Sequence, residues 1–206
     1  MRIQMLGAVI VVLTFSVGAT FAQQPQGGAP GGGGQGRGGG RGPQTPPLIM
    51  TTTAFDDGGI IPAKFAGPMG VSPELKWTQV PMGTQSFVLL MHDPDVALQR
   101  STLDVTHWIV WNIPGTATSL SEGVAPGAEL PDGSRQVSLR SNGYMGPGAP
   151  ATGPYHHYTF ELFALDTKLD VPAATPQEAA ATRAALLKAI DGHALGKAVI
   201  VGRFHQ

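Results

Sequence analysis

The sequence predicts a mostly β fold, and three observations support that prediction. Apolar runs of seven or eight residues recur along the chain from residue 48 onward, which is a usual length for strands. Clusters of glycine and proline separate these runs, as they do in a sandwich or a barrel. Only one segment, near the C-terminus, has the apolar spacing of an amphipathic helix.

Four segments are the strongest strand candidates. They are residues 86–92 (SFVLLMH), 106–113 (THWIVWNI), 158–165 (YTFELFAL) and 198–204 (AVIVGRF). The nearly continuous apolar character of the first segment predicts a strand that is covered on both faces. Weaker candidates are residues 48–55, 64–65, 74–77 and 136–139.

The helix is expected to start at residue 176. Thr175 and Glu178 form a capping box, with Pro176 at the first helical position. Glycine 192 is expected to end the helix. The residues predicted to share its apolar face are Ala180, Ala184, Leu187 and Ile190. The fold class is therefore mostly β, with one or two short helices near the C-terminus that pack against the strands.

Residues 1–22 have the features of a secretory signal peptide. Arg2 gives a positive start, residues 9–17 are apolar, and small residues precede a cleavage site after Ala22. An uncleaved anchor is the alternative, but the apolar run is shorter than the roughly 20 residues that span a bilayer. We therefore expect no transmembrane segment after cleavage, and a periplasmic or secreted protein.

The composition of residues 23–47 predicts a disordered linker. Between residues 27 and 42, 11 of 16 residues are glycine, so little apolar surface is available to offset the entropy of ordering. Arg37 and Arg41 resemble an RNA-binding arginine–glycine tract, but two arginines behind a signal peptide favour a plain tether. The remaining residues, 48–206, have the length of one domain.

The domain is acidic and lacks cysteine. Arg2, Arg37 and Arg41 lie outside it, which leaves ten basic and 14 acidic residues and a formal charge of −4. Nucleic acid is therefore not an expected partner, because phosphate-backbone binding needs a basic face. With no cysteine, the chain has neither disulfides nor a cysteine-linked lipid anchor.

Two predicted strands carry a histidine where an apolar residue is expected. Strict alternation places His107 on the face of Ile109 and Trp111, and places His156 on the face of Tyr158. A buried imidazole needs hydrogen-bond partners for its nitrogens. Each histidine is therefore either a core residue bonded to the backbone or a ligand-binding group at the mouth of an apolar face.

Two further segments have both an ordinary and a functional interpretation. Asp93-Pro94-Asp95 directly follows the first strong strand; it is either an Asx-type turn or a pair of carboxylates that can orient an imidazole. Residues 141–153 (SNGYMGPGAPATG) are either a surface loop or a glycine-rich loop that brings backbone amides close to a ligand.

In combination, these motifs resemble the phosphatidylethanolamine-binding protein (PEBP) family, most closely its bacterial Raf-kinase-inhibitor-like branch. The order is Asp-Pro-Asp, then His107-Trp108, then the NGYxGPxxP loop, and then His-x-Tyr at the start of another strand. The resemblance covers the chain from Ala54 to the C-terminus. Segments VSPELKW, ELFALD and GHALGKA, at residues 71–77, 161–166 and 192–198, are similar to further motifs of that branch.

The resemblance implies an antiparallel β-sandwich with Greek-key connections and a small anion-binding pocket at one end. It implies that seven residues bind the ligand: Asp93, Asp95, His107, Gly148, Pro150, His156 and Tyr158. This chain departs from the family pattern at Ala149, where a second proline is common, and at His157, where arginine is usual. The loop also lacks the cysteine common in the bacterial branch.

These observations predict non-catalytic binding of a small anionic or phosphorylated ligand, in the class of phosphate or a phospholipid head group. We expect no catalytic residue, cofactor or metal, because the sequence has no nucleophile elbow, HExxH motif or P-loop. One alternative is a metal-dependent phosphoester hydrolase that uses His92 with the other histidines and aspartates. Another is an inhibitor of a protease or envelope partner. The protein partner and the oligomeric state, including a homodimer, stay open.

Overall fold

The computed structural model describes residues 47–68, 70–96 and 102–206. The predicted signal peptide lies outside these residues, and so does the predicted linker except for its last residue. The described elements are β1 (Ile49–Thr51), η1 (Ala63–Phe65), β2 (Leu75–Thr78), β3 (Ser86–Asp93), β4 (Val105–Pro114), β5 (Ser119–Leu120), β6 (Arg135–Val137), β7 (His156–Leu165), η2 (Pro176–Glu178), α1 (Ala179–Ile190) and β8 (Ala194–Phe204).

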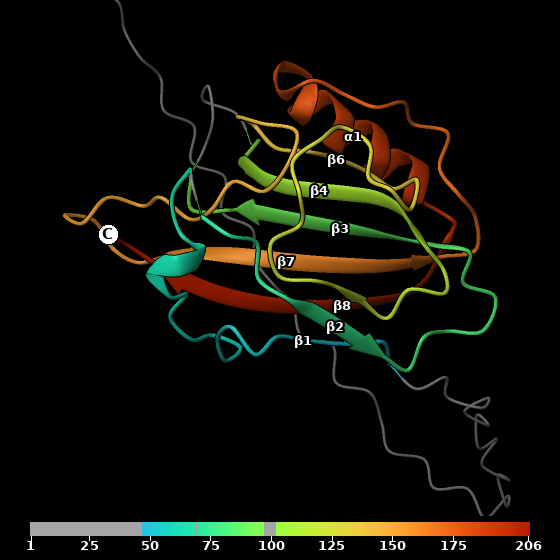
Figure 1. Ribbon diagram of the computed structural model, residues 1–206, viewed down its shortest axis with the longest axis horizontal. Helices are drawn as coiled ribbons and strands as arrows, with labels where there is room; N and C mark the ends of the chain where they lie inside the picture. Colours follow the sequence, from blue (N-terminus) through green and yellow to red (C-terminus); the bar gives the residue numbers. More distant parts are fainter. Residues whose placement is uncertain (1–46, 69, 97–101) are drawn as a thin grey trace, which may run out of the picture. The chain divides into compact units, whose positions relative to one another are not determined.

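The strands form two antiparallel sheets. The smaller sheet has the order β1-β2-β5, and the larger has the order β6-β4-β3-β7-β8. In the larger sheet β3, β4 and β6 lie in chain order, and β7 returns to lie beside β3 (Figure 1). This is the strand order of a Greek key. The prediction of a mostly β sandwich is confirmed.

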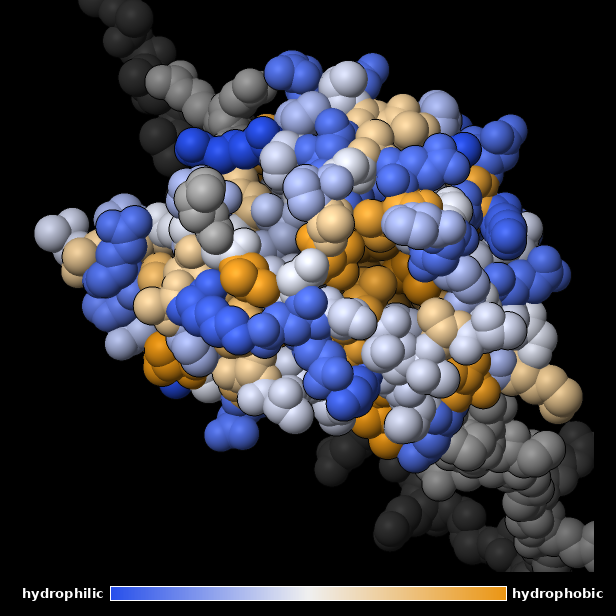
Figure 2. Space-filling model, viewed as in Figure 1, coloured by the Kyte–Doolittle hydropathy of each residue, from blue (hydrophilic) through white to orange (hydrophobic). Residues whose placement is uncertain are grey.

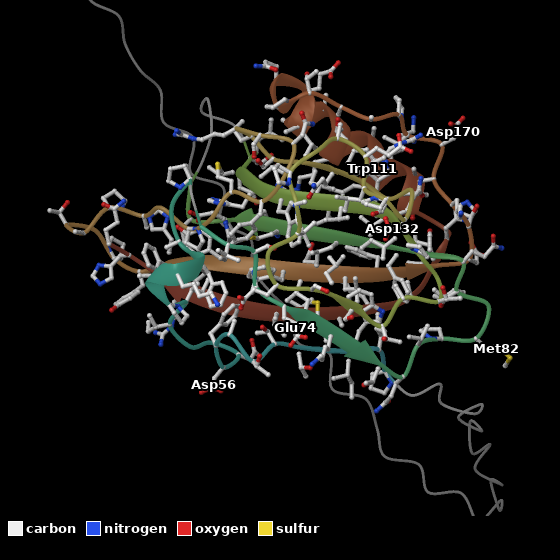
Figure 3. All side chains as sticks on the ribbon, in the orientation of Figure 1. Asp56, Glu74, Met82, Trp111, Asp132 and Asp170 are labelled. Atoms are coloured by element: carbon white, nitrogen blue, oxygen red, sulfur yellow. The ribbon has the colours of Figure 1, made fainter. Side chains whose placement is uncertain are left out.

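The larger sheet is covered on both faces by apolar cores. The first core lies between the two sheets and contains Trp77 of β2 and Tyr158 of β7. The second core lies on the other face and joins Trp111 of β4 to Leu186 of α1 (Figure 3). Residues of β3 alternate between the two cores, which explains why its sequence is apolar almost throughout.

The four strong strand predictions are confirmed as β3, β4, β7 and β8, and three weaker ones are confirmed as the short strands β1, β2 and β6. Residues 64–65 were wrongly predicted as strand. They belong to η1, where the Phe65 amide bonds to the Pro62 carbonyl in a single helical turn. The two-residue strand β5 is too short to leave a periodic signal.

The predicted start and end of the helix are confirmed. Thr175 and Glu178 form the capping box, and Gly192 follows the helix with a φ of 80°. The predicted apolar face is wrong, because Ala180, Ala184 and Leu187 are exposed. The buried residues are Ala179, Thr182, Leu186 and Ile190. The adjacent leucines and the many alanines give this helix two nearly equivalent apolar faces.

A β-bulge interrupts β4 at His107. Met91 of β3 pairs with Trp108 of β4. The next residue, His92, pairs with Thr106, so that His107 is the extra residue on the bulged strand. A bulge of this kind turns the local side-chain directions away from strict alternation.

The bulge overturns the predicted face of His107. Ile109 and Trp111 belong to the second core. His107 instead lies on the first-core side, where its ring meets the edge of Tyr158 with the two ring centroids 5.0 Å apart. His156 and Tyr158 are two residues apart in β7, and the register is regular between them. The two side chains therefore share a face, as predicted.

Hydrophilic and intermediate residues cover most of the surface in Figure 2, and hydrophobic side chains gather mainly in a hollow near its centre. Within the described part of the chain, no helix has the length and apolar character that crossing a bilayer requires.

Candidate functional site

At one end of the larger sheet, the end of β3 lies beside the starts of β4 and β7 (Figure 1). A cavity lined by residues from these strands lies there. The register brings these ends together, because His92 of β3 pairs with Thr106 on one side and with Thr159 on the other. The cavity has a volume of about 490 Å³, within the usual range for small-molecule sites.

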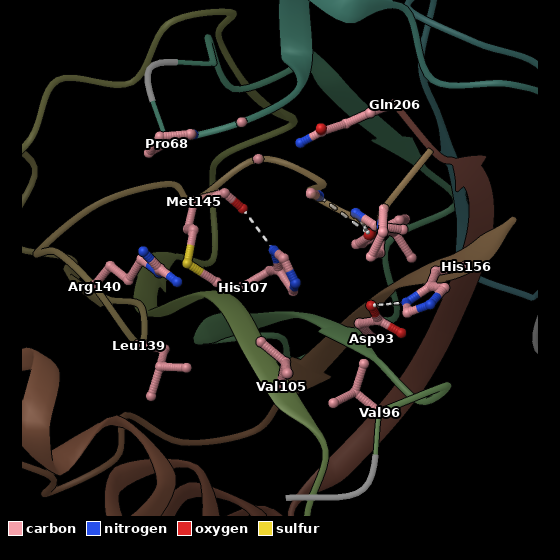
Figure 4. A pocket seen from close by; sticks show the side chains of 16 residues that line it. Pro68, Asp93, Val96, Val105, His107, Leu139, Arg140, Met145, His156 and Gln206 are labelled. Atoms are coloured by element: carbon pink, nitrogen blue, oxygen red, sulfur yellow. Dashed lines mark hydrogen bonds and ion pairs between the residues drawn. The ribbon is translucent and has the colours of Figure 1, made fainter. Parts of the chain in front are cut away.

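Six of the seven predicted site residues line this cavity (Figure 4). They are Asp93, His107, Gly148, Pro150, His156 and Tyr158. The seventh, Asp95, does not line it. The lining residues that sequence reasoning did not assign to the site are Gly67, Pro68, Val96, Val105, Leu139, Arg140, Met145, Gly146, Ala149 and Gln206.

Asp93 is buried at the end of β3 and holds His156 in place. Its Oδ2 atom lies 2.7 Å from Nδ1 of His156, and its Oδ1 atom accepts the backbone N–H of Asp95 at 3.0 Å. Both carboxylate oxygens are therefore engaged within the protein. Because a carboxylate accepts, Nδ1 of His156 carries the proton of this bond, and Nε2 stays available to a ligand.

His107 is fixed by the loop that follows β6. Its Nδ1 atom lies 2.8 Å from the carbonyl oxygen of Met145, and the Met145 amide donates back to the carbonyl of His107 at 3.0 Å. A carbonyl only accepts, so Nδ1 carries a proton. Burial lowers the pKa of His107 below its ordinary value of 6.5, although the Met145 carbonyl and the charge of Asp93 oppose this shift. The ring is therefore neutral near pH 7, with the lone pair on Nε2.

Tyr158 ties the glycine-rich loop to the sheet. Its hydroxyl oxygen accepts the backbone N–H groups of Gly148 and Ala149, each at 3.2 Å. Burial raises the pKa of Tyr158 to about 12, and the neighbouring carboxylate of Asp93 acts in the same direction. The hydroxyl therefore keeps its proton, and the Asp93 carboxylate is a hydrogen-bond acceptor for it.

Asp95 holds the start of β7 from outside the cavity. Its Oδ2 atom accepts the backbone N–H of His157 at 2.6 Å and lies 3.1 Å from the ring Nδ1 of the same residue. Burial raises the pKa of Asp95, but the bonds from His157 outweigh it, so that the pKa lies below the ordinary 3.8. The contacts of Asp95 thus suit a positioning residue better than a ligand-binding one.

Gly146 lies in the roof of the cavity, by which we mean the wall where the loop after β6 meets residues 65–68. It was not among the predicted site residues. Its amide donates to the Gly67 carbonyl at 3.1 Å, and the Gly67 amide donates to Pro147. A Cβ atom at position 146 would lie 2.4 Å from the carbonyl oxygen of Phe65, so only glycine fits. By contrast, a Cβ atom at Gly148 would meet nothing within 4 Å. The sequence of the loop cannot distinguish these two glycines, because the contact comes from residues 65–67.

The geometry does not assemble the ligand set of the hydrolase alternative. Among the described residues, no group of three or more His, Cys, Asp or Glu side chains could hold a metal ion. Asp93 and Asp95 turn toward different histidines. His92 bonds to Asp104 at 2.7 Å and does not line the cavity.

A β-sandwich with one hydrogen-bonding cavity at the strand ends defines a class of small-ligand-binding proteins. The family model for "Phosphatidylethanolamine-binding protein" matches residues 51–205 of this chain. The chain belongs to the phosphatidylethanolamine-binding protein family.

Three relatives illustrate the range of the similarity. The UPF0098 protein of Methanothermobacter thermautotrophicus is 38% identical over 160 residues, covering 76% of this chain and 98% of the relative. The crystal structure of YbcL of E. coli, described as a member of the mammalian PEBP family, is similar with a TM-score of 0.65 and 27% identity. That likeness covers 77% of this chain and 98% of YbcL. LppC of Mycobacterium tuberculosis, named as a candidate lipoprotein, is 36% identical over 167 residues, which are 79% of this chain and 74% of LppC.

Proposed function

We propose that the protein binds a small anionic, phosphoryl-bearing ligand in this cavity and does not transform it. The observation that carries the proposal is the convergence of His107, His156 and Tyr158, from two strands, around the buried carboxylate of Asp93. A phospholipid head group, of the kind that the family is named after, is one member of this ligand class.

Asp93 is compatible with an anionic ligand because of its hydrogen bonds. An unpaired carboxylate in the cavity floor would repel an anion. Both oxygens of Asp93 are bonded, to His156 and to the Asp95 amide. These bonds spread the negative charge into the protein and turn it away from the cavity.

The positions of the protons on His107 and Tyr158 determine which protonation state of the ligand can bind. Nδ1 of His107 is committed to Met145, so a neutral His107 offers the cavity only the lone pair of Nε2. A phosphoryl group that carries a proton can donate to this lone pair, and it can accept from the hydroxyl of Tyr158 when that hydroxyl turns from Asp93 to the ligand. A fully ionised group instead needs a protonated His107. In both cases binding takes up a proton, so affinity should rise as the pH falls.

Titration with inorganic phosphate tests the proposal. We expect the imidazole NMR resonances of His107 and His156 to shift saturably, while a chromogenic phosphoester is not hydrolysed in the presence of divalent metals. Resonances that stay unmoved at these two histidines while others shift would place the binding site elsewhere. Metal-dependent turnover that is lost in His107→Ala would instead support the hydrolase.

We also propose an extracytoplasmic location, on the strength of the signal-like residues 1–22. Amino-terminal sequencing of the protein from its native cells should find Gln23 at the start. An intact Met1 in the folded protein would contradict cleavage.

A further inference from the structure

Arg140, at the rim of the cavity, extends the proposed function to a particular ligand class. We propose that Arg140 is a specificity-determining residue that binds a second anionic group of the ligand. The site then selects phosphoesters that carry another negative charge over phosphoesters that carry an ammonium group. This inference rests on the phosphoryl-binding function proposed above.

Charge is the first argument for this role. Among the described residues that line the cavity, Arg140 alone has a permanent positive charge. Its side chain has no hydrogen bond or ion pair with any of the residues that the structure describes. In contrast, Arg183 pairs with Asp104 and Arg135 donates to the Val171 carbonyl. The guanidinium of Arg140 is therefore free to bind a ligand.

The backbone that carries Arg140 is well fixed. Ser138 and Ser141 close a turn around it, because the Ser138 amide donates to the Ser141 carbonyl at 2.7 Å and the Ser141 amide donates to the Ser138 hydroxyl at 3.1 Å. The Leu139 amide donates to the Thr106 carbonyl at 3.1 Å, directly before His107. The turn thus holds Arg140 beside the strand that supplies His107.

The direction of the side chain agrees with this placement. In Figure 4, Arg140 points into the cavity beside Met145, while Asp93 and His156 lie on the other side of His107. A ligand whose phosphoryl group sits between His107 and His156 would extend its remaining atoms toward Arg140.

The size and lining of the cavity leave room for such a ligand. A volume of about 490 Å³ far exceeds the space that one phosphoryl group needs. Val105, Leu139 and Met145 give the wall an apolar portion that can contact a short organic spacer. The planar guanidinium then matches a terminal carboxylate or a second phosphoryl group, which it can bind through two parallel hydrogen bonds.

Among the described residues of the cavity, an ammonium group finds no comparable partner. It would be repelled by Arg140. The carboxylate of Asp93 already accepts from His156 and from the Asp95 amide. Phosphoethanolamine should therefore gain little from its second functional group.

Calorimetry on the chain without its predicted signal peptide, residues 23–206, tests the inference with three probes: inorganic phosphate, phosphoglycolate and phosphoethanolamine. We expect phosphoglycolate to bind about tenfold more tightly than phosphoethanolamine. Arg140→Gln should remove this preference and leave the affinity for inorganic phosphate within about twofold. Lys168→Gln is the matched control, because Lys168 is an exposed cation beyond the opposite end of β7 from His156. It should change none of the three affinities.

Other outcomes separate the two proposals. Equal binding of the two phosphoesters, or an unchanged preference in Arg140→Gln, would refute the role of Arg140 while phosphoryl binding stands. An equal loss for inorganic phosphate and phosphoglycolate in Arg140→Gln would assign Arg140 to the phosphoryl group and overturn the second-anion site. Failure of the unaltered protein to bind any of the three probes would refute the proposed function itself, and this inference with it.

Discussion

His92 and Asp93 are neighbours on β3, yet they belong to two polar clusters of opposite character. Asp93 pairs with His156 at the floor of the cavity. His92 pairs with Asp104 at 2.7 Å on the helix side of the sheet, and its Nε2 atom lies 3.8 Å from Glu161. Each cluster thus combines a histidine with a carboxylate, but only the first opens onto a cavity.

In the cluster around His92, each carboxylate is paired with a permanently charged cation. Arg183 of α1 pairs with Asp104, and Lys197 of β8 pairs with Glu161 at 2.6 Å. Its charges are thereby neutralised within the protein, and α1 is tied to the larger sheet. The comparison teaches that residue type does not separate a structural cluster from a candidate binding site. Access to a cavity does, because the cluster around His92 also contains atoms without a hydrogen-bond partner, Nε2 of His92 and Nε of Arg183.

The largest expected effect comes from breaking the closed cluster. Asp104→Ala should lower the free energy of unfolding by about 3 kcal/mol, because it leaves the largely buried Arg183 and His92 without their carboxylate. Phosphate affinity should stay within about twofold, since Asp104 does not line the cavity. Urea unfolding and calorimetry on the same variant measure both quantities. A large loss of affinity with unchanged stability would reverse the assignment of the two clusters.

The roof of the cavity gives the next largest effect. Gly146→Ala should cost about 2 kcal/mol of stability and at least tenfold in phosphate affinity, because the added methyl group meets the Phe65 carbonyl at 2.4 Å. Gly148→Ala is the control for stability, since its methyl group meets no protein atom within 4 Å. Thermal unfolding and phosphate titration of both variants check this difference. Similar behaviour of the two alanine variants would show that the roof can move away.

His156 should affect both binding and stability. His156→Ala is expected to weaken phosphate binding about tenfold and to lower the free energy of unfolding by about 2 kcal/mol, because the buried Asp93 carboxylate loses a hydrogen-bond partner. The adjacent His157→Ala removes an exposed imidazole of the same size that pairs with Asp95 outside the cavity. Calorimetry should find its phosphate affinity unchanged. Equal losses in both variants would point to a general effect at the start of β7.

Much of the fold could be predicted because its strongest elements carry local signals. The doubly covered strand β3 is apolar throughout, and α1 has a capping box and a terminal glycine. The buried face of α1 could not be predicted, because Leu186 and Leu187 offer alternatives that only the position of the sheet decides. The bulge at His107 was also invisible, since it depends on the register against β3.

The sequence predicted those residues of the candidate site that belong to its motifs. The motifs supplied six lining residues, but motif membership alone did not separate Asp95, which holds His157, from Asp93. Arg140 lacked a signal because its placement comes from a contact across the chain, to Thr106 through Leu139. Gly146 belongs to the NGYxGPxxP motif, but the motif does not reveal its close contact with residues 65–67. Such contacts are set by the tertiary structure and not by local sequence.

The last prediction concerns the pH dependence of binding, and sulfate is the ligand that isolates it, because this dianion does not itself titrate near neutral pH. The groups around His107 are Tyr158 and His156 from β7, Asp93 from β3, Arg140 from the rim and the Met145 and Gly146 backbone. The charge of His92 acts on His107 from the other face of the sheet. Burial keeps the pKa of free His107 below 6.5, and a bound dianion should raise it. Sulfate affinity should therefore increase by up to about tenfold per unit as the pH falls from 8 toward 6.

His107→Asn tests the source of this dependence, because asparagine can still donate to the Met145 carbonyl but cannot titrate. Its sulfate affinity should be nearly flat with pH. Without ligand the sign is opposite: the unfolded chain binds more protons than the folded protein below pH 6.5, so the stability due to His107 is lost as the pH falls. Calorimetric unfolding should thus find that acid destabilises the free protein and that sulfate reverses part of this loss. A flat profile in the unaltered protein would mean that no proton accompanies the anion, and that the neutral ring of His107 does not contact it.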